Sequence, residues 1–216
     1  MIRTLLLDLD GTLVHSVPDL ATALNRLMRA RGLAEFSQAE TTLMVGDGVA
    51  KLVERALAAR GLAPDSRAVA EFSADYAAHS TDETRPYAGV ADGLRLLAGE
   101  GWRLAVCTNK PESTARSLLS ALQLGSVFTA IGGGDSFPVR KPDPAHLLAT
   151  LRAAGGDQAH AIMAGDHTND VAAASGAGIP CIFAGWGYGP HSMAAGAVAV
   201  ASDFTDLVAI ARRLLS

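Results

Sequence analysis

The sequence predicts an α/β fold in which a doubly wound, Rossmann-like parallel sheet carries an inserted all-helical cap domain. Two observations predict it. From Arg85 onward, short apolar runs alternate with helical segments, which is typical of parallel strands covered by helices on both faces. Before Arg85, one apolar run ending at residue 9 resembles a strand, and the segments that follow it are helical. We therefore expect residues 1–13 and 85–216 to form the core and residues 14–84 to form the cap.

Five apolar runs are the candidate strands of the sheet. They are continuous rather than alternating, which is typical of strands buried on both faces. The runs cover residues 3–9, 102–108, 127–133, 160–166 and 179–185. Ligands of an open parallel sheet bind at the carboxyl ends of its strands, so the polar residues that follow these runs are candidates for a site.

The cap segment is expected to contain four helices. Ser16 is a candidate N-cap of the first, with Asp19 three residues later as a capping-box acid, and Gly32 ends it. A second capping box begins at Ser37. The segment VAKLVERALAAR and the stretch of residues 69–76 predict the other two helices.

Composition narrows the class of partner. The chain has 216 residues, of which 49% are hydrophobic, enough for a substantial core. Its net charge of −4 and pI near 5.8, without a lysine or arginine cluster, argue against a nucleic-acid or anionic-membrane surface. Small molecules are the expected partners, and a monomer and a homodimer are both left open.

A cytoplasmic location is expected. Cys107 and Cys181 lie in apolar runs and predict buried thiols rather than a disulfide. Residues 171–202 carry no Asp, Glu, Lys or Arg, but prolines and glycines interrupt them, so no membrane span is expected. The amino-terminal apolar run is too short for a secretory signal.

Several residues with reactive side chains follow the candidate strands. Because the carboxyl ends of parallel strands meet at one edge of a sheet, we expect these side chains to converge. They are Asp8, Asp10, Thr108, Asn109, Lys141, Asp166 and Asp170.

These residue types fit phosphoryl transfer through an aspartyl phosphate. Asp8 and Asp10 are two positions apart on a strand and point to the same side, so one can be the nucleophile and the other the proton carrier. Attack of a carboxylate on a phosphate dianion also needs a hard cation such as Mg²⁺, a fixed positive charge and a hydrogen-bond donor. The candidates for these three parts are Asp166 with Asp170, Lys141, and Thr108, respectively.

Four segments, DLDGTLVHS, VCTNK, VRKPDP and GDHTND, resemble in order and spacing the four motifs of the haloacid dehalogenase superfamily of phosphatases. The resemblance covers essentially the whole chain. It implies that Asp8 is the nucleophile and that Asp10 protonates the leaving group and then activates water. It also implies that Thr108 and Lys141 hold the phosphate, with Asn109 beside them.

The same resemblance implies the metal site. Mg²⁺ would be bound by Asp8, the backbone carbonyl of Asp10, and Asp166, with Asp170 supporting the site. A backbone ligand at Asp10 makes physical sense, because direct coordination would depress the pKa of a side chain that must begin protonated.

Within the superfamily, the segments MVGDGVAKLVERAL, RPYAGV, CTNKPE and GGGDSFPVRKPDPAHLL look most like phosphoglycolate phosphatases. The implied substrate is 2-phosphoglycolate. The helical insertion resembles the first cap class, which closes over the substrate, with hinges expected near residues 14–16 and 85–87.

The cap resemblance also suggests where substrate specificity is set. Gly46, Asp47 and Gly48 form the expected specificity loop, and the N-terminus of the helix that follows could receive a substrate carboxylate. Lys51 and Arg55 are candidate helpers in substrate binding.

Two positions depart from the family pattern. His15 stands where an aspartate is frequent after the first motif, and His167 stands beside Asp166 where a serine is common. Neither change removes a reacting group, but both bear on cap contacts and substrate preference.

Single residues of this set also have simpler interpretations. The DxDG segment could be a calcium loop, but the positions that would need an acid or amide and a bidentate glutamate hold Thr12 and Asp19. Lys141 alone would be an ordinary surface lysine, and Asp166 and Asp170 could be turn or cap residues. Their combination with Asp8 and Asp10 favours a site.

Other functions are compatible with the same residues. A phosphatase for another sugar or metabolite phosphate, or a phosphomutase, would use the same core residues. A receiver-like signalling module, phosphorylated on aspartate, also combines acids, Mg²⁺, threonine and lysine on a parallel sheet. The cap and Asp10 argue against a receiver, because Asp10 would promote loss of the phosphoryl group.

Overall fold

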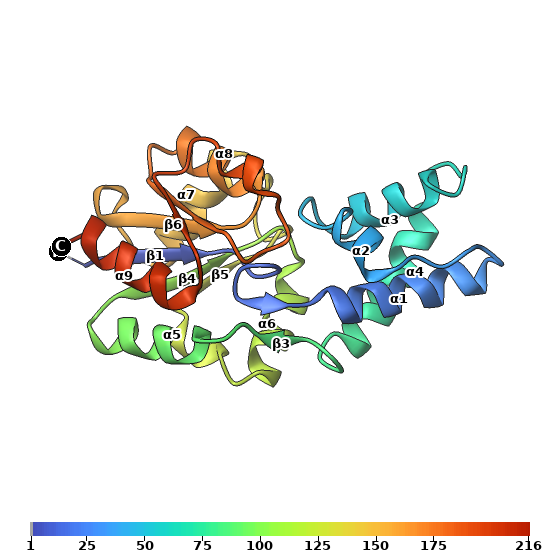
Figure 1. Cartoon of the computed structure of the whole chain (residues 1–216), viewed down its shortest axis with the longest axis horizontal. Coiled ribbons are helices and arrows are strands. Elements are labelled where there is room, and N and C mark those ends of the chain that lie inside the picture. Colours follow the sequence, from blue (N-terminus) through green and yellow to red (C-terminus); the bar gives the residue numbers. More distant parts are fainter. Residues whose placement is uncertain (1) are drawn as a thin grey trace.

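The computed structural model describes residues 2–216, which form a parallel sheet of six strands and a separate group of helices beside it (Figure 1). In spatial order, the strands are β5 (Ala130–Gly132), β4 (Arg103–Cys107), β1 (Thr4–Leu7), β6 (Ala161–Gly165), β7 (Cys181–Ala184) and β8 (Ala199–Ala201). The predicted doubly wound α/β fold is confirmed.

Successive residues of the central strands pack against opposite layers of helices. Leu5 and Leu7 of β1 lie in one core, and Leu6 lies in the other. The first core is closed by α5 (Val90–Gly99), α6 (Glu112–Ala121) and α9 (Phe204–Leu214). The second is closed by α7 (Pro144–Ala153) and α8 (Thr168–Gly176). All of these β1 side chains are fully buried, as its continuous apolar run predicts.

The strand order creates a switch point beside β1. Leu7 at the end of β1 pairs with Val106 of β4 on one side and with Ala164 of β6 on the other. The segments that leave these three strands therefore start at the same edge of the sheet. In an open parallel sheet this is where ligands bind.

The edges of the sheet differ from the predicted strands. The run 127–133 shortens to a three-residue strand, because Gly125–Val127 forms a 3₁₀ helix before it. β8, which the sequence did not predict, pairs with β7 at the opposite edge. Edge strands are covered less fully than central ones, so their apolar pattern is weaker. Two more 3₁₀ helices occur at Gln158–His160 and His191–Ala194.

The helices between β1 and β4 form their own apolar core. They are α1 (Val17–Ala30), α2 (Gln38–Thr42), α3 (Val49–Ala58) and α4 (Ser66–His79), and we refer to this group as the cap. Leu24, Phe72 and Tyr76 are among their buried side chains. Figure 1 shows this group beyond the carboxyl edge of the sheet, on the side opposite the C-terminus.

Two short strands connect the helical group to the core. β2 (Val14–His15) and β3 (Arg85–Pro86) pair antiparallel, with Val14 opposite Pro86 and His15 opposite Arg85. The expectation that residues 14–84 are all helical is wrong at Val14 and His15, because pairing with a segment seventy residues away decides their conformation.

The capping box predicted for α1 is also wrong. Ser16 precedes the helix, but its hydroxyl is buried without a hydrogen-bond partner among the described residues. Asp19 instead accepts hydrogen bonds from the backbone N–H groups of Glu83 and Thr84, at 2.9 and 2.8 Å, and from the Thr84 hydroxyl at 2.7 Å. The carboxylate therefore ties the start of α1 to the returning segment. The capping box at Ser37 and Glu40 is confirmed.

Between residues 2 and 216, the helices are too short or too polar to cross a membrane.

Candidate active site

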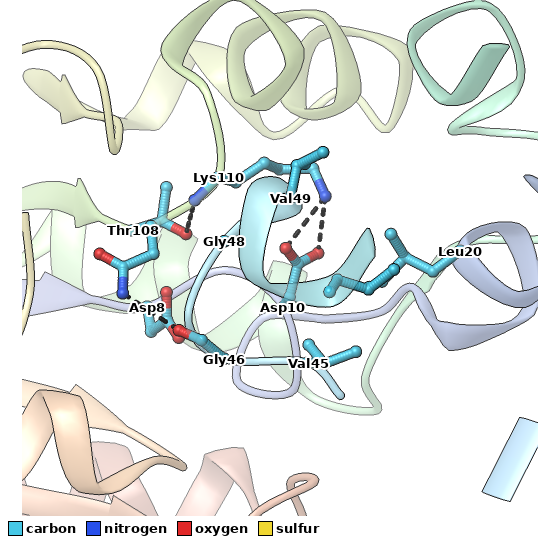
Figure 2. Close-up of a pocket in the computed structure, with 11 residues that line it drawn as sticks. Asp8, Asp10, Leu20, Val45, Gly46, Gly48, Val49, Thr108 and Lys110 are labelled. Atoms are coloured by element: carbon cyan, nitrogen blue, oxygen red, sulfur yellow. Dashed lines mark hydrogen bonds and ion pairs between the residues drawn. The ribbon is translucent and has the colours of Figure 1, made fainter. Parts of the chain in front are cut away.

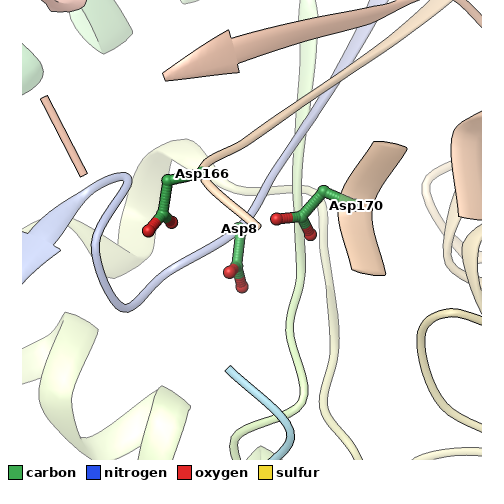
Figure 3. A group of neighbouring side chains, drawn as sticks. All are labelled: Asp8, Asp166 and Asp170. Carbon is green, nitrogen blue, oxygen red and sulfur yellow. The ribbon is translucent and has the colours of Figure 1, made fainter. Parts of the chain in front are cut away.

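Three buried aspartates meet at the carboxyl edge of the sheet (Figure 3). Asp8 follows β1, Asp166 follows β6, and Asp170 lies in the first turn of α8. One carboxylate oxygen from each lies within 4.8 Å of the others. Side chains from distant parts of the chain are thus brought together as the strand order requires, and their negative charges need compensation.

Burial and mutual repulsion raise the pKa of two of these carboxyl groups. Burial, followed by the charges of Asp8 and Asp170, raises the pKa of Asp166 to about 8. The Thr12 hydroxyl and the Tyr188 backbone N–H each donate to Asp166 at 2.8 Å, which opposes the rise. Burial also raises the pKa of Asp170, to about 6. Without a bound cation, these two carboxyl groups therefore hold their protons more tightly than free aspartates do.

Lys141 supplies one positive charge to this cluster. Its Nζ donates to Asp170 at 2.6 Å and lies 2.9 Å from Oδ1 of Asp8. Burial disfavours the charged lysine, but Asp170 and Asp8 outweigh burial and raise its pKa. The lysine stays charged, and one ammonium group does not balance three carboxylates.

The donor set fits a hard divalent cation. Oδ1 of Asp8 is buried, and within residues 2–216 no hydrogen bond reaches it, although the Lys141 ammonium lies nearby. Carboxylate oxygens in a buried cluster of excess negative charge are the ligands that Mg²⁺ prefers. The three aspartates are the residues that could hold such an ion.

Backbone turns pack closely around Asp166. Gly11 has φ +85° in the turn after Asp10, and a Cβ there would overlap the Asp166 carboxylate. A Cβ at Gly187 would overlap the same side chain. The two glycines therefore let the main chain enclose this carboxylate, and any larger residue would displace it.

Asp10 is held by a lysine that the sequence analysis missed. The Nζ of Lys110 donates to both carboxylate oxygens of Asp10, at 3.0 and 2.9 Å (Figure 2). It also donates to the hydroxyl of Tyr76, on α4, at 2.8 Å. Lys110 directly follows Thr108 and Asn109 in the VCTNK segment, so its position after a strand was a signal that could have identified it.

Lys110 is a buried cation. Only 4% of its surface is exposed. Burial disfavours its charge, but the carboxylate of Asp10 and the hydroxyl of Tyr76 outweigh burial and raise its pKa. Burial also raises the pKa of Tyr76, to about 12. The pair is therefore a charged lysine bonded to a neutral phenol.

Thr108 and Asn109 follow β4 at the same edge. The Thr108 backbone N–H donates to the carbonyl of Gly132 at 2.9 Å, which continues the sheet and fixes the residue beside Asp8. The Asn109 side-chain amide donates to the carbonyls of Gly46 and Lys141, both at 3.0 Å. Asn109 thus binds the cap loop to the core.

The loop of residues 46–48 reaches the site from the cap. The Asn169 side-chain amide donates to Oδ1 of Asp47 at 2.7 Å and to the Gly46 carbonyl at 3.3 Å. Gly48 has φ +86° and precedes α3. Burial would raise the pKa of Asp47, but hydrogen bonds from Asn169 and Arg55 outweigh burial and lower it. The loop is therefore anchored to the start of α8.

The two basic residues expected to help bind substrate have other partners. Arg55 donates to the Asp47 carboxylate and to the Met44 carbonyl, so its hydrogen bonds hold the loop of residues 46–48 in place. Lys51 pairs with Glu54 at 2.7 Å on an exposed face. Neither lysine nor arginine from α3 lines the cavities beside Asp8, and the structure does not bring Lys51 to the site.

A cavity lies between Asp8 and the cap; we call it the cap cavity (Figure 2). Its core wall carries charged and polar side chains, and its cap wall is mostly apolar. The lining residues are Asp8, Asp10, Leu20, Val45, Gly46, Gly48, Val49, Leu52, Thr108, Asn109 and Lys110. A second cavity reaches Asp8 from the side of Asp166 and Tyr188.

The two unusual histidines have structural partners. His167 is the N-cap of α8. Its ring Nδ1 accepts from the Asn169 backbone N–H, and its backbone N–H donates to the Asp170 carboxylate at 3.0 Å. It therefore caps the helix as a serine would. His15 lies 3.2 Å from the Tyr188 hydroxyl, which also accepts from the backbone N–H of Ser16. Tyr188 thus connects β2 to the loop beside Asp166.

Comparisons with known proteins find related sequences over most of the chain. A family model described as haloacid dehalogenase-like hydrolase matches residues 5–184. The chain is 43% identical over 216 residues to a phosphoglycolate phosphatase of Rhodospirillum rubrum, covering 96% of the chain and 90% of that protein. It is 47% identical over 176 residues to a phosphoglycolate phosphatase of Cereibacter sphaeroides, covering 80% of each.

The fold is similar to solved structures as well. A crystal structure described as that of a predicted phosphoglycolate phosphatase from Haemophilus somnus 129PT superposes with a TM-score of 0.90. The sequences are 28% identical, and 97% of each chain is covered. The likeness therefore extends over the helical group as well as the sheet.

Proposed function

The chain belongs to the haloacid dehalogenase-like hydrolases and is a phosphoric monoester hydrolase, and from this premise we propose that it hydrolyses 2-phosphoglycolate through an aspartyl phosphate on Asp8 with the help of Mg²⁺. The observation that carries the proposal is the meeting of Asp8 with Asp166, Asp170 and Lys141 at one edge of the sheet. A nucleophile, an acidic metal site and a fixed cation are the parts that phosphoryl transfer needs.

Asp8 is the proposed nucleophile. One of its carboxylate oxygens attacks phosphorus, the new P–O bond forms, and the bond from phosphorus to the ester oxygen breaks. Lys141, 2.9 Å from Asp8, and the Thr108 hydroxyl stabilise the negative charge of the transferred oxygens. Two residues that follow separate strands therefore hold the phosphoryl group while a third attacks it.

Asp10 is the proposed acid and base. It gives its proton to the departing alkoxide, so that glycolate leaves as an alcohol. It then takes a proton from water as that water attacks the phosphorus of the aspartyl phosphate, which releases inorganic phosphate and restores Asp8. Its place two residues beyond Asp8, beside the cap cavity, supports this role.

Mg²⁺ would be held by Asp8, Asp166 and the backbone carbonyl of Asp10, with Asp170 supporting. When bound, it neutralises charge on the cluster and polarises the phosphoryl oxygens. Thr12 and the Tyr188 backbone N–H orient the Asp166 carboxylate for this task, since each donates to a different oxygen of it. His167 and Lys141 orient Asp170 in the same way.

We propose that residues 14–84 act as the cap over a core of residues 1–13 and 85–216, with β2 and β3 as the hinge. The apolar cap wall formed by Leu20, Val49 and Leu52 excludes water from the cavity beside Asp8. Two observations support 2-phosphoglycolate as substrate. The relatives described above are named phosphoglycolate phosphatases, and the cap cavity adjoins the nucleophile.

The test is a panel of substrates assayed for initial phosphate release, with Mg²⁺ and with EDTA. The panel contains 2-phosphoglycolate, phosphorylated sugars, phosphoserine, pyrophosphate and a chromogenic aryl phosphate. We expect 2-phosphoglycolate to lead in kcat/KM by about tenfold or more, a transition-state preference of about 1.4 kcal/mol. EDTA should abolish release reversibly.

The panel also distinguishes the alternatives. A leading sugar phosphate would replace the proposed substrate but keep the core chemistry, and transfer to a sugar hydroxyl would indicate a mutase. Slow loss of a phosphoryl group from Asp8, without turnover of any member, would indicate a receiver-like module instead.

A further inference from the structure

We propose that Lys110 is the residue that recognises the carboxylate of the substrate, and that this carboxylate displaces Asp10 from Lys110 and so frees Asp10 for proton transfer. The inference rests on the proposed function, because it assigns one end of a carboxylated phosphomonoester to one side chain. It replaces the expectation that Lys51 or Arg55 of the cap takes this part.

The first step is the position of Lys110. It lines the cap cavity together with Asp8, so a ligand whose phosphoryl group reaches Asp8 extends toward it. Among the lining residues, all of which the structure describes, Lys110 is the single cationic side chain. The cap wall opposite it is apolar, with Leu20, Val49 and Leu52. An anionic substituent in this cavity therefore meets one lining side chain that can balance its charge.

The second step is the pairing of Asp10. Both of its carboxylate oxygens accept from Lys110 in this conformation (Figure 2). An oxygen held there cannot also contact the ester oxygen of a substrate on Asp8. Asp10, which is a carboxylate in this contact, must therefore leave Lys110 and take up a proton from water before it can act as an acid.

The third step is the energetic cost of separating Asp10 from Lys110. Lys110 is 4% exposed, and a buried ammonium group without a counter-charge is strongly disfavoured. A substrate carboxylate restores the counter-charge at the moment Asp10 turns away. A substrate with a neutral group at this end cannot supply that counter-charge, so Asp10 stays paired with Lys110.

The fourth step is the anchoring of Lys110 itself. The hydroxyl of Tyr76 accepts from its Nζ at 2.8 Å, and the ammonium lies 4.5 Å from the centre of the Tyr76 ring. Tyr76 is 1% exposed on α4 of the cap. Lys110 therefore stays in place when its carboxylate partner changes, and it does so where the cap meets the core.

The test compares 2-phosphoglycolate with ethyl phosphate, in which a methyl group replaces the carboxylate. The quantity measured is the ratio of the two kcat/KM values. In Lys110→Met this ratio should fall by about tenfold or more, because a charge-assisted hydrogen bond is lost with one substrate only. Loss of the Lys110 contact also frees Asp10 when ethyl phosphate is the substrate, which lowers the ratio in the same direction. Arg95→Met, which removes an exposed charge on α5, controls for net charge and should leave the ratio unchanged.

Two outcomes separate the inference from the proposed function. If the unmodified protein does not prefer 2-phosphoglycolate to ethyl phosphate, the proposed substrate is wrong. If the unmodified protein prefers 2-phosphoglycolate and Lys110→Met keeps this preference, Lys110 is not the recognition residue. The same conclusion holds if Lys51→Met, rather than Lys110→Met, loses the preference. A thermal melt checks that Lys110→Met is folded, and Lys110→Gln is used if it is not.

A binding measurement tests the displacement itself. In an Asp8→Asn background, which prevents turnover, Asp10→Asn removes the carboxylate that competes for Lys110. The affinity for 2-phosphoglycolate, measured by titration calorimetry, should then rise several-fold relative to that for ethyl phosphate. An equal change in both affinities, or none, would contradict displacement of Asp10 by the substrate.

Discussion

The link between Asp19 and the returning segment at Thr84 allows a quantitative prediction. Asp19 is 3% exposed and accepts from two backbone N–H groups and one hydroxyl. Asp19→Ala would leave the buried Thr84 N–H without a partner, at about 1–3 kcal/mol. The Glu83 N–H is less enclosed, and replacement of its bond by water costs about 0.5–1.5 kcal/mol. The free energy of unfolding should therefore fall by about 1.5–4.5 kcal/mol.

Urea denaturation measures this change. Glu54→Ala is the matched control, because Glu54 pairs with Lys51 in the same group of helices but both side chains are more than 40% exposed. Exposed ion pairs contribute about 0–1 kcal/mol, so the control should lose at most that much. If Asp19→Ala were no more destabilising than Glu54→Ala, the argument that Asp19 fastens the hinge would be refuted.

The remaining predictions concern the metal cluster and the cap core. In the metal-free protein, Asp166 holds a proton up to a pKa of about 8, whereas its ordinary value is 3.8. The folded state therefore binds more protons than the unfolded state between these values, and stability falls as pH rises through that window. The rise in Tm caused by Mg²⁺ should accordingly grow from about pH 6 to about pH 8.5, and thermal melts of Asp166→Asn should show little growth. Gly11→Ala should weaken Mg²⁺ binding in calorimetry, since its Cβ overlaps Asp166; unchanged affinity would show that the turn adapts. Phe72→Ala, at a fully buried position of the cap, should cost about 3–5 kcal/mol in urea denaturation, and a loss below about 1 kcal/mol would mean that the cap core collapses around it.

The sheet was predictable because its signals are local. Continuous apolar runs mark the central strands, and a parallel sheet brings whatever follows them to one edge. The sequence therefore predicts that Asp8, Thr108 and Asp166 lie near one another. Their functional roles rest on the proposed mechanism.

Other features depend on contacts between distant segments. The spacing of Ser16 and Asp19 satisfies the capping-box rule, yet Asp19 binds a segment more than sixty residues away, and tertiary contacts override the local pattern. Lys110 is distinguished by its contact with Tyr76 on the cap, which no local pattern encodes. Asn169 was missed for the same reason, since its partner Asp47 lies on another part of the chain.

The central claim is that Asp8 carries the phosphoryl group between substrate and water. The most direct test is hydrolysis of a thiophosphate analogue of the substrate that carries two oxygen isotopes on a chiral phosphorus. The reaction is run in water of the third isotope, so that the inorganic thiophosphate released is itself chiral. Each in-line displacement inverts the phosphorus, so transfer to Asp8 followed by hydrolysis predicts net retention of configuration. Net inversion would mean that water attacks the substrate directly, and Asp8 would then be a metal ligand rather than the nucleophile.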